Sequence, residues 1–164
     1  SIYNPEQIVL GDNIRIDDFC ILSGNIKLGS YIHISAYTCL IGGVKGIILQ
    51  DFVTVSSRCA VYAVSDDFSG EQLNNSMIPT AYRSVIEGRV ILEDYVSVGT
   101  GSTILPGVKL EEGAAVGAMS FVKHTLEGWK IYAGAPCRYV KDRNQNMKQL
   151  RAALQNSDAY EESR

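Results

Sequence analysis

Acid–base chemistry near neutral pH depends on few side chains here, because only two residues of the sequence are histidines. Imidazole has the ordinary pKa closest to neutrality, so it is a natural proton acceptor for an attacking hydroxyl. His33 directly precedes the aliphatic Ile34, and neighbouring side chains of a strand point to opposite faces. If Ile34 is buried, His33 points outward, either as a general base or as a surface histidine without a role. For His124 we expect a peripheral role.

A second group of polar side chains lies in a long non-repetitive stretch, residues 62–88. Long ordered loops in compact domains are usually binding loops or lids. These side chains therefore either wall a binding site against a neighbouring coil or subunit, or form a solvated surface. The group consists of Ser65, Asp66, Asp67, Ser69 and Glu71.

The sequence gives little support for catalysis by a metal ion or by a cysteine thiol. A catalytic zinc ion held by three histidines needs one more histidine than the chain contains. Cys39 and Cys137 follow neither a CxxC nor a metal-ligand spacing. Cys20 and Cys59 occupy positions at which a small apolar side chain is expected to point inward. We therefore expect four reduced structural thiols and no bound metal.

Composition places the chain among ordinary globular domains. It has 164 residues, and 15 Lys and Arg against 18 Asp and Glu give a net charge of −3. The basic residues are scattered, which argues against nucleic acid or an anionic membrane as the main partner. No apolar stretch approaches the ~18 residues of a spanning helix, and the N-terminal residues do not resemble a secretory signal. The expected location is therefore the cytoplasm.

The elements that must position these residues follow from a six-residue repeat of aliphatic anchors, each followed four residues later by a small or apolar companion. The repeat is interrupted by a slip of two to three residues at 44–48 and by residues 62–88. The anchors are Leu10, Ile16, Leu22, Leu28, Ile34, Leu40, Leu49, Val55, Val61, Leu92, Val98, Ile104, Leu110, Val116 and Val122. The companions are Ile14, Cys20, Ile26, Ile32, Thr38, Val44, Val53, Cys59, Val96, Ser102, Val108, Ala114 and Ser120.

This period fits neither a helix nor an ordinary strand, and it makes a β-sandwich with period-two strands the weaker alternative. Six residues supply one short strand and one turn, and three such units close a triangular coil. Fifteen anchors at three per coil predict an all-β parallel solenoid of about five coils over residues 1–141. Residues 62–88 leave it as an excursion loop, and residues 142–164 hold a short amphipathic helix and a polar, frayed tail.

The segments VILEDYVSVGTGSTILPGVKLEEGAAVGAMSFV at 90–122 and IYAGAPCRYVK at 131–141 resemble the hexapeptide-repeat acyltransferases. The resemblance covers roughly residues 8–141. It is greatest to the galactoside, maltose and xenobiotic O-acetyltransferases and to sugar acetyltransferases of bacterial surface-polysaccharide synthesis. SDDFSGE at 65–71 resembles a loop signature of the polysaccharide group. The resemblance implies a left-handed parallel β-helix, a homotrimer with sites between subunits, and acetyl-CoA as donor.

The resemblance also assigns residues to coenzyme A. Two small side chains match positions that line the pantetheine groove, and four basic ones match positions near the coenzyme's phosphates. These six residues are Thr100, Ala118, Lys123, His124, Arg138 and Lys141.

The function implied is acetyl transfer to a hydroxyl of a saccharide or nucleotide sugar, as in O-antigen synthesis. The catalytic histidine of the galactoside-type relatives has no counterpart in residues 62–88, so His33 is the predicted base. Asp66 or Asp67 would orient it or hold the sugar. Two alternatives stay open: N-acetylation of a nucleotide-linked amino sugar, where less base assistance is needed, and a non-catalytic β-solenoid scaffold.

Overall fold

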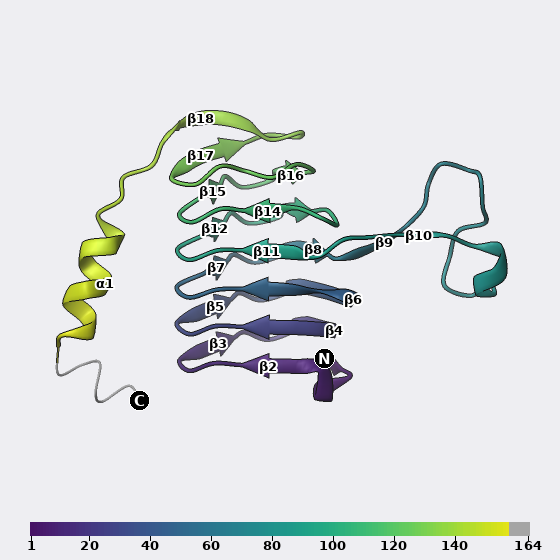
Figure 1. Ribbon diagram of the computed structural model, residues 1–164, viewed down its shortest axis with the longest axis horizontal. Coiled ribbons are helices and arrows are strands. Elements are labelled where there is room, and N and C mark those ends of the chain that lie inside the picture. The colour runs from purple at the N-terminus through teal and green to yellow at the C-terminus, as the bar shows by residue number, and fades with distance from the viewer. Residues whose placement is uncertain (158–164) are drawn as a thin grey trace.

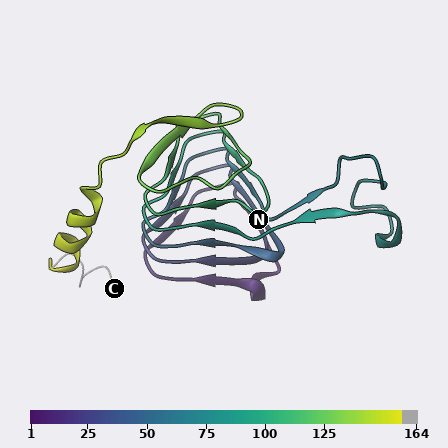
Figure 2. The ribbon, with the colours of Figure 1, turned by 45° about the horizontal axis from the view of Figure 1, so that its top comes forward.

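The computed structural model of the protein describes residues 1–157, and most of them form a triangular prism of stacked coils (Figure 1). Each coil supplies short strands to three faces, and each strand pairs in parallel with strands of the coils above and below. Figure 2, turned toward the top of the prism, shows the coils stacked on one another. The predicted all-β, left-handed parallel solenoid is confirmed.

The strands divide among three faces. The first face holds β2 (Ile8–Leu10), the second halves of β4 (Ile21–Leu28) and β6 (Cys39–Leu49), β11 (Val90–Leu92) and β14 (Lys109–Leu110). The second face holds β3 (Ile14–Ile16), β5 (Ile32–Ile34), β7 (Thr54–Val55), β12 (Ser97–Val98), β15 (Ala115–Val116) and β17 (Lys130–Ala133). The third face holds β1 (Ile2–Tyr3), the first halves of β4 and β6, β8 (Ala60–Tyr62), β13 (Thr103–Ile104) and β16 (Phe121–Val122).

Six further elements lie outside these parallel ladders. They are the 3-10 turns η1 (Pro5–Gln7) and η2 (Thr80–Tyr82), the hairpin strands β9 (Val64–Asp66) and β10 (Val85–Glu87), the antiparallel return strand β18 (Arg138–Asp142) and helix α1 (Met147–Gln155). The polar tail expected after the helix lies, from residue 158 onward, outside the described residues. No helix among residues 1–157 is long and apolar enough to cross a membrane.

The anchors and companions fill the prism as predicted, with two corrections. Leu10 is 54% exposed, because it belongs to the first coil and has no coil beneath it. Val44 is 76% exposed, because the turn at residues 42–46 bulges outward at the slip in the repeat. Ile47, which pairs with Ile26 of the coil below, is buried in its place.

The number of coils was underestimated. Across the described residues each face carries six levels, and the return strand β18 brings the prism to about seven turns. The added levels were missed because no aliphatic residue occupies the anchor positions after Val122, where residues 128 and 134 are glycines. Leu126 and Tyr132, both buried, follow the last anchor Val122 by four and ten residues.

One column of companions, Cys20, Thr38, Cys59, Ser102 and Ser120, is buried and bonded from coil to coil. The Thr38 hydroxyl donates to the Ser56 carbonyl at 3.0 Å, and the Ser102 hydroxyl to the Gly117 carbonyl at 3.1 Å. The thiols do the same less strongly, with Cys59 Sγ 3.2 Å from the Gly99 carbonyl. Small polar side chains are tolerated inside because each finds a partner.

The prism has three corners, which we name by what stands on them. The loop corner, between the third and first faces, carries the excursion loop. The helix corner, between the first and second faces, faces α1, and the open corner lies between the second and third faces. Side chains of left-handed residues stack outside the last two. The helix-corner column is Tyr31, Phe52, Tyr95 and Trp129, and the open-corner column is Phe19, Tyr37, Arg58 and Met119.

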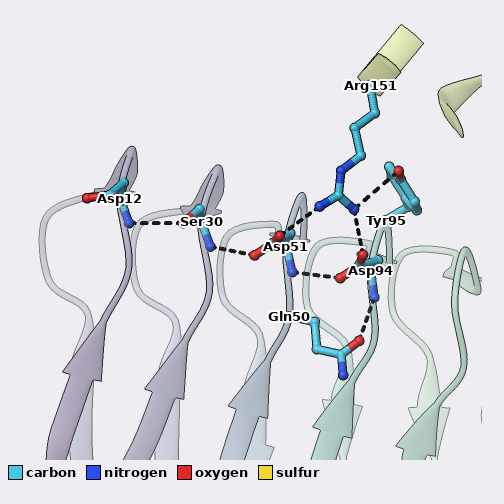
Figure 3. A network of polar contacts seen from close by, with 7 residues as sticks. All are labelled: Asp12, Ser30, Gln50, Asp51, Asp94, Tyr95 and Arg151. Atoms are coloured by element: carbon cyan, nitrogen blue, oxygen red, sulfur yellow. Dashed lines mark hydrogen bonds and ion pairs between the residues drawn. The ribbon is translucent and has the colours of Figure 1, made fainter. Parts of the chain in front are cut away.

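Helix α1 is held at the helix corner by Arg151 (Figure 3). Its guanidinium bonds Asp94 at 2.6 Å and Asp51 at 2.9 Å, and it lies 4.9 Å from the centre of the Phe52 ring. The two carboxylates also accept backbone N–H groups, Asp94 from Asp51 and Asp51 from Ser30, each at 2.9 Å. One side chain of the helix therefore bonds two successive coils directly and is linked to a third through Asp51.

Candidate active site

A pocket of about 690 Å³ lies where the β9–β10 hairpin leaves the prism (Figure 1). The hairpin pairs Asp66 with Val85 and Val64 with Glu87. Directly opposed residues of an antiparallel pair share one face of the ribbon, and alternate residues along each strand share it too. All four of these side chains line the pocket.

The third face of the prism supplies the other wall, through Ile41, Tyr62 and Leu105. Burial and then the nearby Cys39 thiol raise the pKa of Tyr62, whose hydroxyl lies 4.0 Å from Cys39 Sγ. Tyr62 therefore stays protonated at neutral pH and is a hydrogen-bond donor at the wall of the pocket. The site combines a mostly apolar wall with a hairpin that carries two acidic side chains, Asp66 and Glu87, and one basic side chain, Arg83.

The two predicted loop carboxylates differ in what they do. Asp67 accepts the Ser69 N–H and the Ser84 hydroxyl, both at 2.8 Å, so it ties the two strands of the excursion together. These bonds, with that of the Ser69 amide largest, lower the pKa of Asp67. Asp66 lines the pocket, and no donor within residues 1–157 bonds its carboxylate. Asp66 is therefore the loop carboxylate available to a ligand.

His33 points outward on β5 of the second face, as predicted, and its partner is Asp17. Nε2 of His33 lies 2.9 Å from Asp17 Oδ2, and Arg15 Nε lies 2.7 Å from Oδ1 of the same carboxylate. The hydrogen bond from His33, and after it that from Arg15, lowers the pKa of Asp17. A carboxylate only accepts, so Nε2 carries a proton and Nδ1 of a neutral His33 is free to take one.

Within one chain, the structure does not bring His33 and the loop carboxylates together. His33 lies on the second face, whereas Asp66 lines a pocket on the third. The position predicted to orient the imidazole is filled by Asp17, which the sequence analysis missed. A signal existed, because each coil takes 18 residues in the first repeats and Arg15 therefore pairs with His33 one coil above. Asp17 follows two residues later.

The six residues assigned to coenzyme A occupy three places. Thr100 and Ala118 follow one another up the open corner, where the Met119 N–H donates to the Thr100 carbonyl at 2.8 Å. Arg138 and Lys141 are exposed on β18, opposite Ala133 and Ile131 of β17.

The remaining two, Lys123 and His124, are exposed just beyond β16, at the turn toward the loop corner. Small residues at the open corner and basic residues at the top of the prism fit a long ligand with phosphates at one end. One chain does not gather all six around a single groove.

Three polar residues of the pocket escaped the sequence analysis: Tyr62, Arg83 and Glu87. Arg83 and Glu87 lie on the returning strand of the excursion. Their positions depend on how 85–87 pairs with 64–66 across the tip. The six-residue repeat does not extend into the hairpin, so nothing in the sequence indicated this register.

Comparisons with known proteins agree with this geometry. No protein-family model matches the sequence. The dTDP-4-amino-4,6-dideoxy-D-glucose acyltransferase of Escherichia coli is 36% identical over 160 residues, which cover 96% of this chain and 83% of the relative. WbbJ of Escherichia coli K12, named for O-acetyl transfer in lipopolysaccharide biosynthesis, is 26% identical and covers 90% of this chain and 75% of its own.

Among solved structures, a serine-to-alanine variant of AntD, an N-acyltransferase from Bacillus cereus, superposes with a TM-score of 0.93 at 51% identity. The match covers 94% of this chain and 83% of that one, and the complex holds dTDP-4-amino-4,6-dideoxyglucose and coenzyme A. Another AntD complex holds dTDP and 3-hydroxybutyryl-CoA.

A prism of six-residue units with a pocket beside one long excursion defines a hexapeptide-repeat protein. This chain belongs to the hexapeptide-repeat, left-handed β-helix acyltransferase family. Family membership argues against the non-catalytic scaffold. The relatives favour N-acylation over the expected O-acetylation.

Proposed function

We propose that this protein transfers an acyl group from acyl-coenzyme A to the amino group of a dTDP-linked 4-amino-4,6-dideoxy sugar. The observation that carries the proposal is the pocket at the hairpin, with the free carboxylate of Asp66 in its wall. The likeness to AntD in complex with such a sugar over 94% of the chain supports it. O-acetylation of a saccharide, as in the name of WbbJ, is the second candidate, supported at 26% identity.

The chemistry needs few groups. An amino sugar arrives largely as ammonium and must lose a proton before its nitrogen attacks the thioester carbonyl. The C–N bond forms as the C–S bond breaks, the amide nitrogen gives up a second proton, and coenzyme A leaves as the thiol. Asp66 offers a carboxylate that holds the ammonium and receives its proton. Asp67 shapes the loop through Ser69 and Ser84.

The proposed role of His33 depends on the assembly of subunits into an oligomer. The hairpin extends away from its own prism, and no other element of residues 1–157 covers its outer side (Figures 1 and 2). In a homotrimer, the second face of a neighbouring subunit would close that side and bring His33, oriented by Asp17, toward the acceptor. His33 is then a base, as the sequence predicted, with Asp17 as the positioning residue. Light scattering that shows a monomer at micromolar concentration would contradict this arrangement.

Acyl-coenzyme A would lie along the open corner past Thr100 and Ala118, with its phosphates near Arg138 and Lys141. The last two are exposed and make no core contact. Replacing both with alanine should raise the KM for acetyl-CoA about tenfold and leave Tm nearly unchanged. An unchanged KM would remove them from the donor site.

The acceptor test compares an amine with a hydroxyl in the same nucleotide sugar. We expect release of coenzyme A with dTDP-4-amino-4,6-dideoxyglucose to exceed that with dTDP-6-deoxyglucose by at least about 10²-fold, because the amine is the better nucleophile. Acetyl-CoA and 3-hydroxybutyryl-CoA are assayed as donors in parallel. Faster turnover of the hydroxyl sugar or of maltose would favour the O-acetyl candidate.

Three variants test the residues. Asp66→Asn should lower kcat about 10²-fold, the usual value of a positioned proton acceptor, and His33→Ala should do so to a similar extent. Asp17→Asn should shift the pH profile of kcat without abolishing activity, because it changes how His33 is held. Normal kcat in His33→Ala at saturating substrates would leave Asp66 as the only base.

A further inference from the structure

Arg83 is the one cationic side chain that lines the hairpin pocket. It is half-buried, and within residues 1–157 its guanidinium has neither an ion pair nor a hydrogen bond. The other arginine of this segment, Arg89, is exposed and donates to the Lys45 carbonyl at 3.0 Å. A half-buried guanidinium with unused donors, facing a pocket, is a site for an anion.

The pairing of the hairpin gives the spacing of its charges. Glu87 faces Val64 at the base, Asp66 faces Val85 one step out, and Asp67 N–H bonds the Ser84 carbonyl beyond them. The ladder ends there, and Arg83, which bridges Leu73, precedes Val85 by two residues and lines the same pocket one step further out along the returning strand. Successive steps on one face of a strand are about 7 Å apart. Anionic and cationic groups therefore follow one another along a single ribbon.

We propose that Arg83 binds the diphosphate of the nucleotide-linked acceptor while Asp66 holds its amino group, so that the sugar ring spans the distance between these two side chains. This inference rests on the proposed function. In a 4-amino sugar the amine lies across the pyranose ring from the anomeric carbon that carries the diphosphate. One sugar ring with its glycosidic oxygen therefore separates the cation from the anion, which matches one step of the ribbon.

The charges of the pocket match a dipolar ligand of this kind better than an uncharged saccharide. Maltose would leave both the guanidinium and the carboxylate without charged partners. A guanidinium also presents two parallel N–H groups to phosphate oxygens, which fixes orientation as well as affinity. Arg83 would thus make the enzyme specific for nucleotide-linked sugars and would set which ring position reaches the acyl donor.

The test measures binding without turnover. Titration calorimetry with dTDP and with thymidine compares the wild type, Arg83→Gln and the control Arg89→Gln. We expect Arg83→Gln to weaken dTDP about tenfold or more and to leave thymidine unchanged, because only the phosphates lose a partner. Arg89→Gln should bind both ligands like the wild type. Arg83→Lys should recover part of the dTDP affinity, since a point charge replaces the bidentate group.

Steady-state kinetics provide a second test of the role of Arg83. Arg83→Gln should raise the KM for the dTDP-amino sugar without changing the KM for acetyl-CoA, and should not affect slow acylation of the free amino sugar. Equal dTDP binding by wild type and Arg83→Gln, or equal weakening of thymidine, overturns the role of Arg83 and leaves the proposed function standing. A wild type that does not bind dTDP overturns the proposed function itself.

Discussion

The helix corner and the open corner are built by the same repeat position but end in different environments. Both stack aromatic side chains from left-handed residues, with φ of 63° at Tyr95 and also at Phe19 and Tyr37. Ring centres are 5.6 Å apart between Phe52 and Tyr95 and 4.9 Å apart between Phe19 and Tyr37. Yet Tyr95 is 5% exposed, whereas Phe19 is 70% exposed.

The difference comes from the C-terminal segment, which follows no repeat. Arg143 donates to the carbonyls of Tyr95 and Gly113 at 2.8 and 3.0 Å, and burial lowers the pKa of its guanidinium. Lys148 lies 4.9 Å from the Trp129 ring, and Arg151 bonds Asp94 and Asp51, which lie two and three coils lower. The repeat places a column of side chains on each of these two corners. The C-terminal segment, which lies outside the repeat, covers only the column at the helix corner. A left-handed aromatic residue is costly, so the comparison can be tested by substitution.

The largest difference is expected for Tyr95→Ala against Tyr37→Ala. Tyr95→Ala removes a buried ring from between Phe52 and Trp129 and should lower the free energy of unfolding by about 3 kcal/mol. Tyr37→Ala removes an exposed ring and should cost less than about 1 kcal/mol. Urea unfolding at one fixed protein concentration measures both. A loss at Tyr37 as large as that at Tyr95 would show that another copy covers the open corner in solution.

The next contrast concerns the cations of the two columns. Arg151→Met keeps a long apolar side chain but leaves Asp51 and Asp94 without their partner, so we expect a loss of about 2 kcal/mol. The matched Arg58→Met at the open corner should change stability by less than about 0.5 kcal/mol. Faster proteolysis within residues 144–157 of Arg151→Met would locate the loss in the helix. Equal effects at the two corners would contradict the role of Arg151 in holding helix α1 at the helix corner.

Substitution by glycine should change stability in opposite directions at the two corners. Arg58→Gly relieves a left-handed backbone at φ 59° and should stabilise the protein by about 0.5–1 kcal/mol after the entropy of the unfolded chain is counted. Phe52→Gly, also at φ 59°, should destabilise it, because a stacked ring is lost. Thermal unfolding of the two variants side by side gives the signs. Stabilisation by both would mean that stacking does not offset backbone strain.

The smallest effect is a pH dependence at the foot of the open corner. The pKa of Asp17 is lowered by His33 and Arg15 in the folded protein, so its carboxylate binds protons less readily there than in the unfolded chain. Its contribution to stability is therefore complete above the ordinary pKa of about 3.9 and is lost as pH falls through the folded value. The stability difference between wild type and Asp17→Asn should shrink below about pH 4. A difference independent of pH would show that the ionised carboxylate is not the cause.

The sequence by itself determined the prism. Its repeat predicted which side chains point inward, that His33 points outward, and that residues 62–88 leave the coil. Repetition is what makes this possible, because in a solenoid the neighbour of a residue lies one coil away in sequence. Where the repeat slipped, at Val44, and where it ended, before Leu126, the prediction was wrong or incomplete.

Only the tertiary structure decided the contacts that no repeat specifies. The register of the hairpin places Asp66 and Arg83 on one wall of a pocket, and Arg151 meets Asp51 from 100 residues away. Such contacts join residues that are far apart in the sequence through only a few polar bonds, so no local spacing in the sequence indicates them. The same reason explains why the sequence named Asp66 but not Arg83, whereas Asp17, beside Arg15 one coil below His33, was within reach of the 18-residue period.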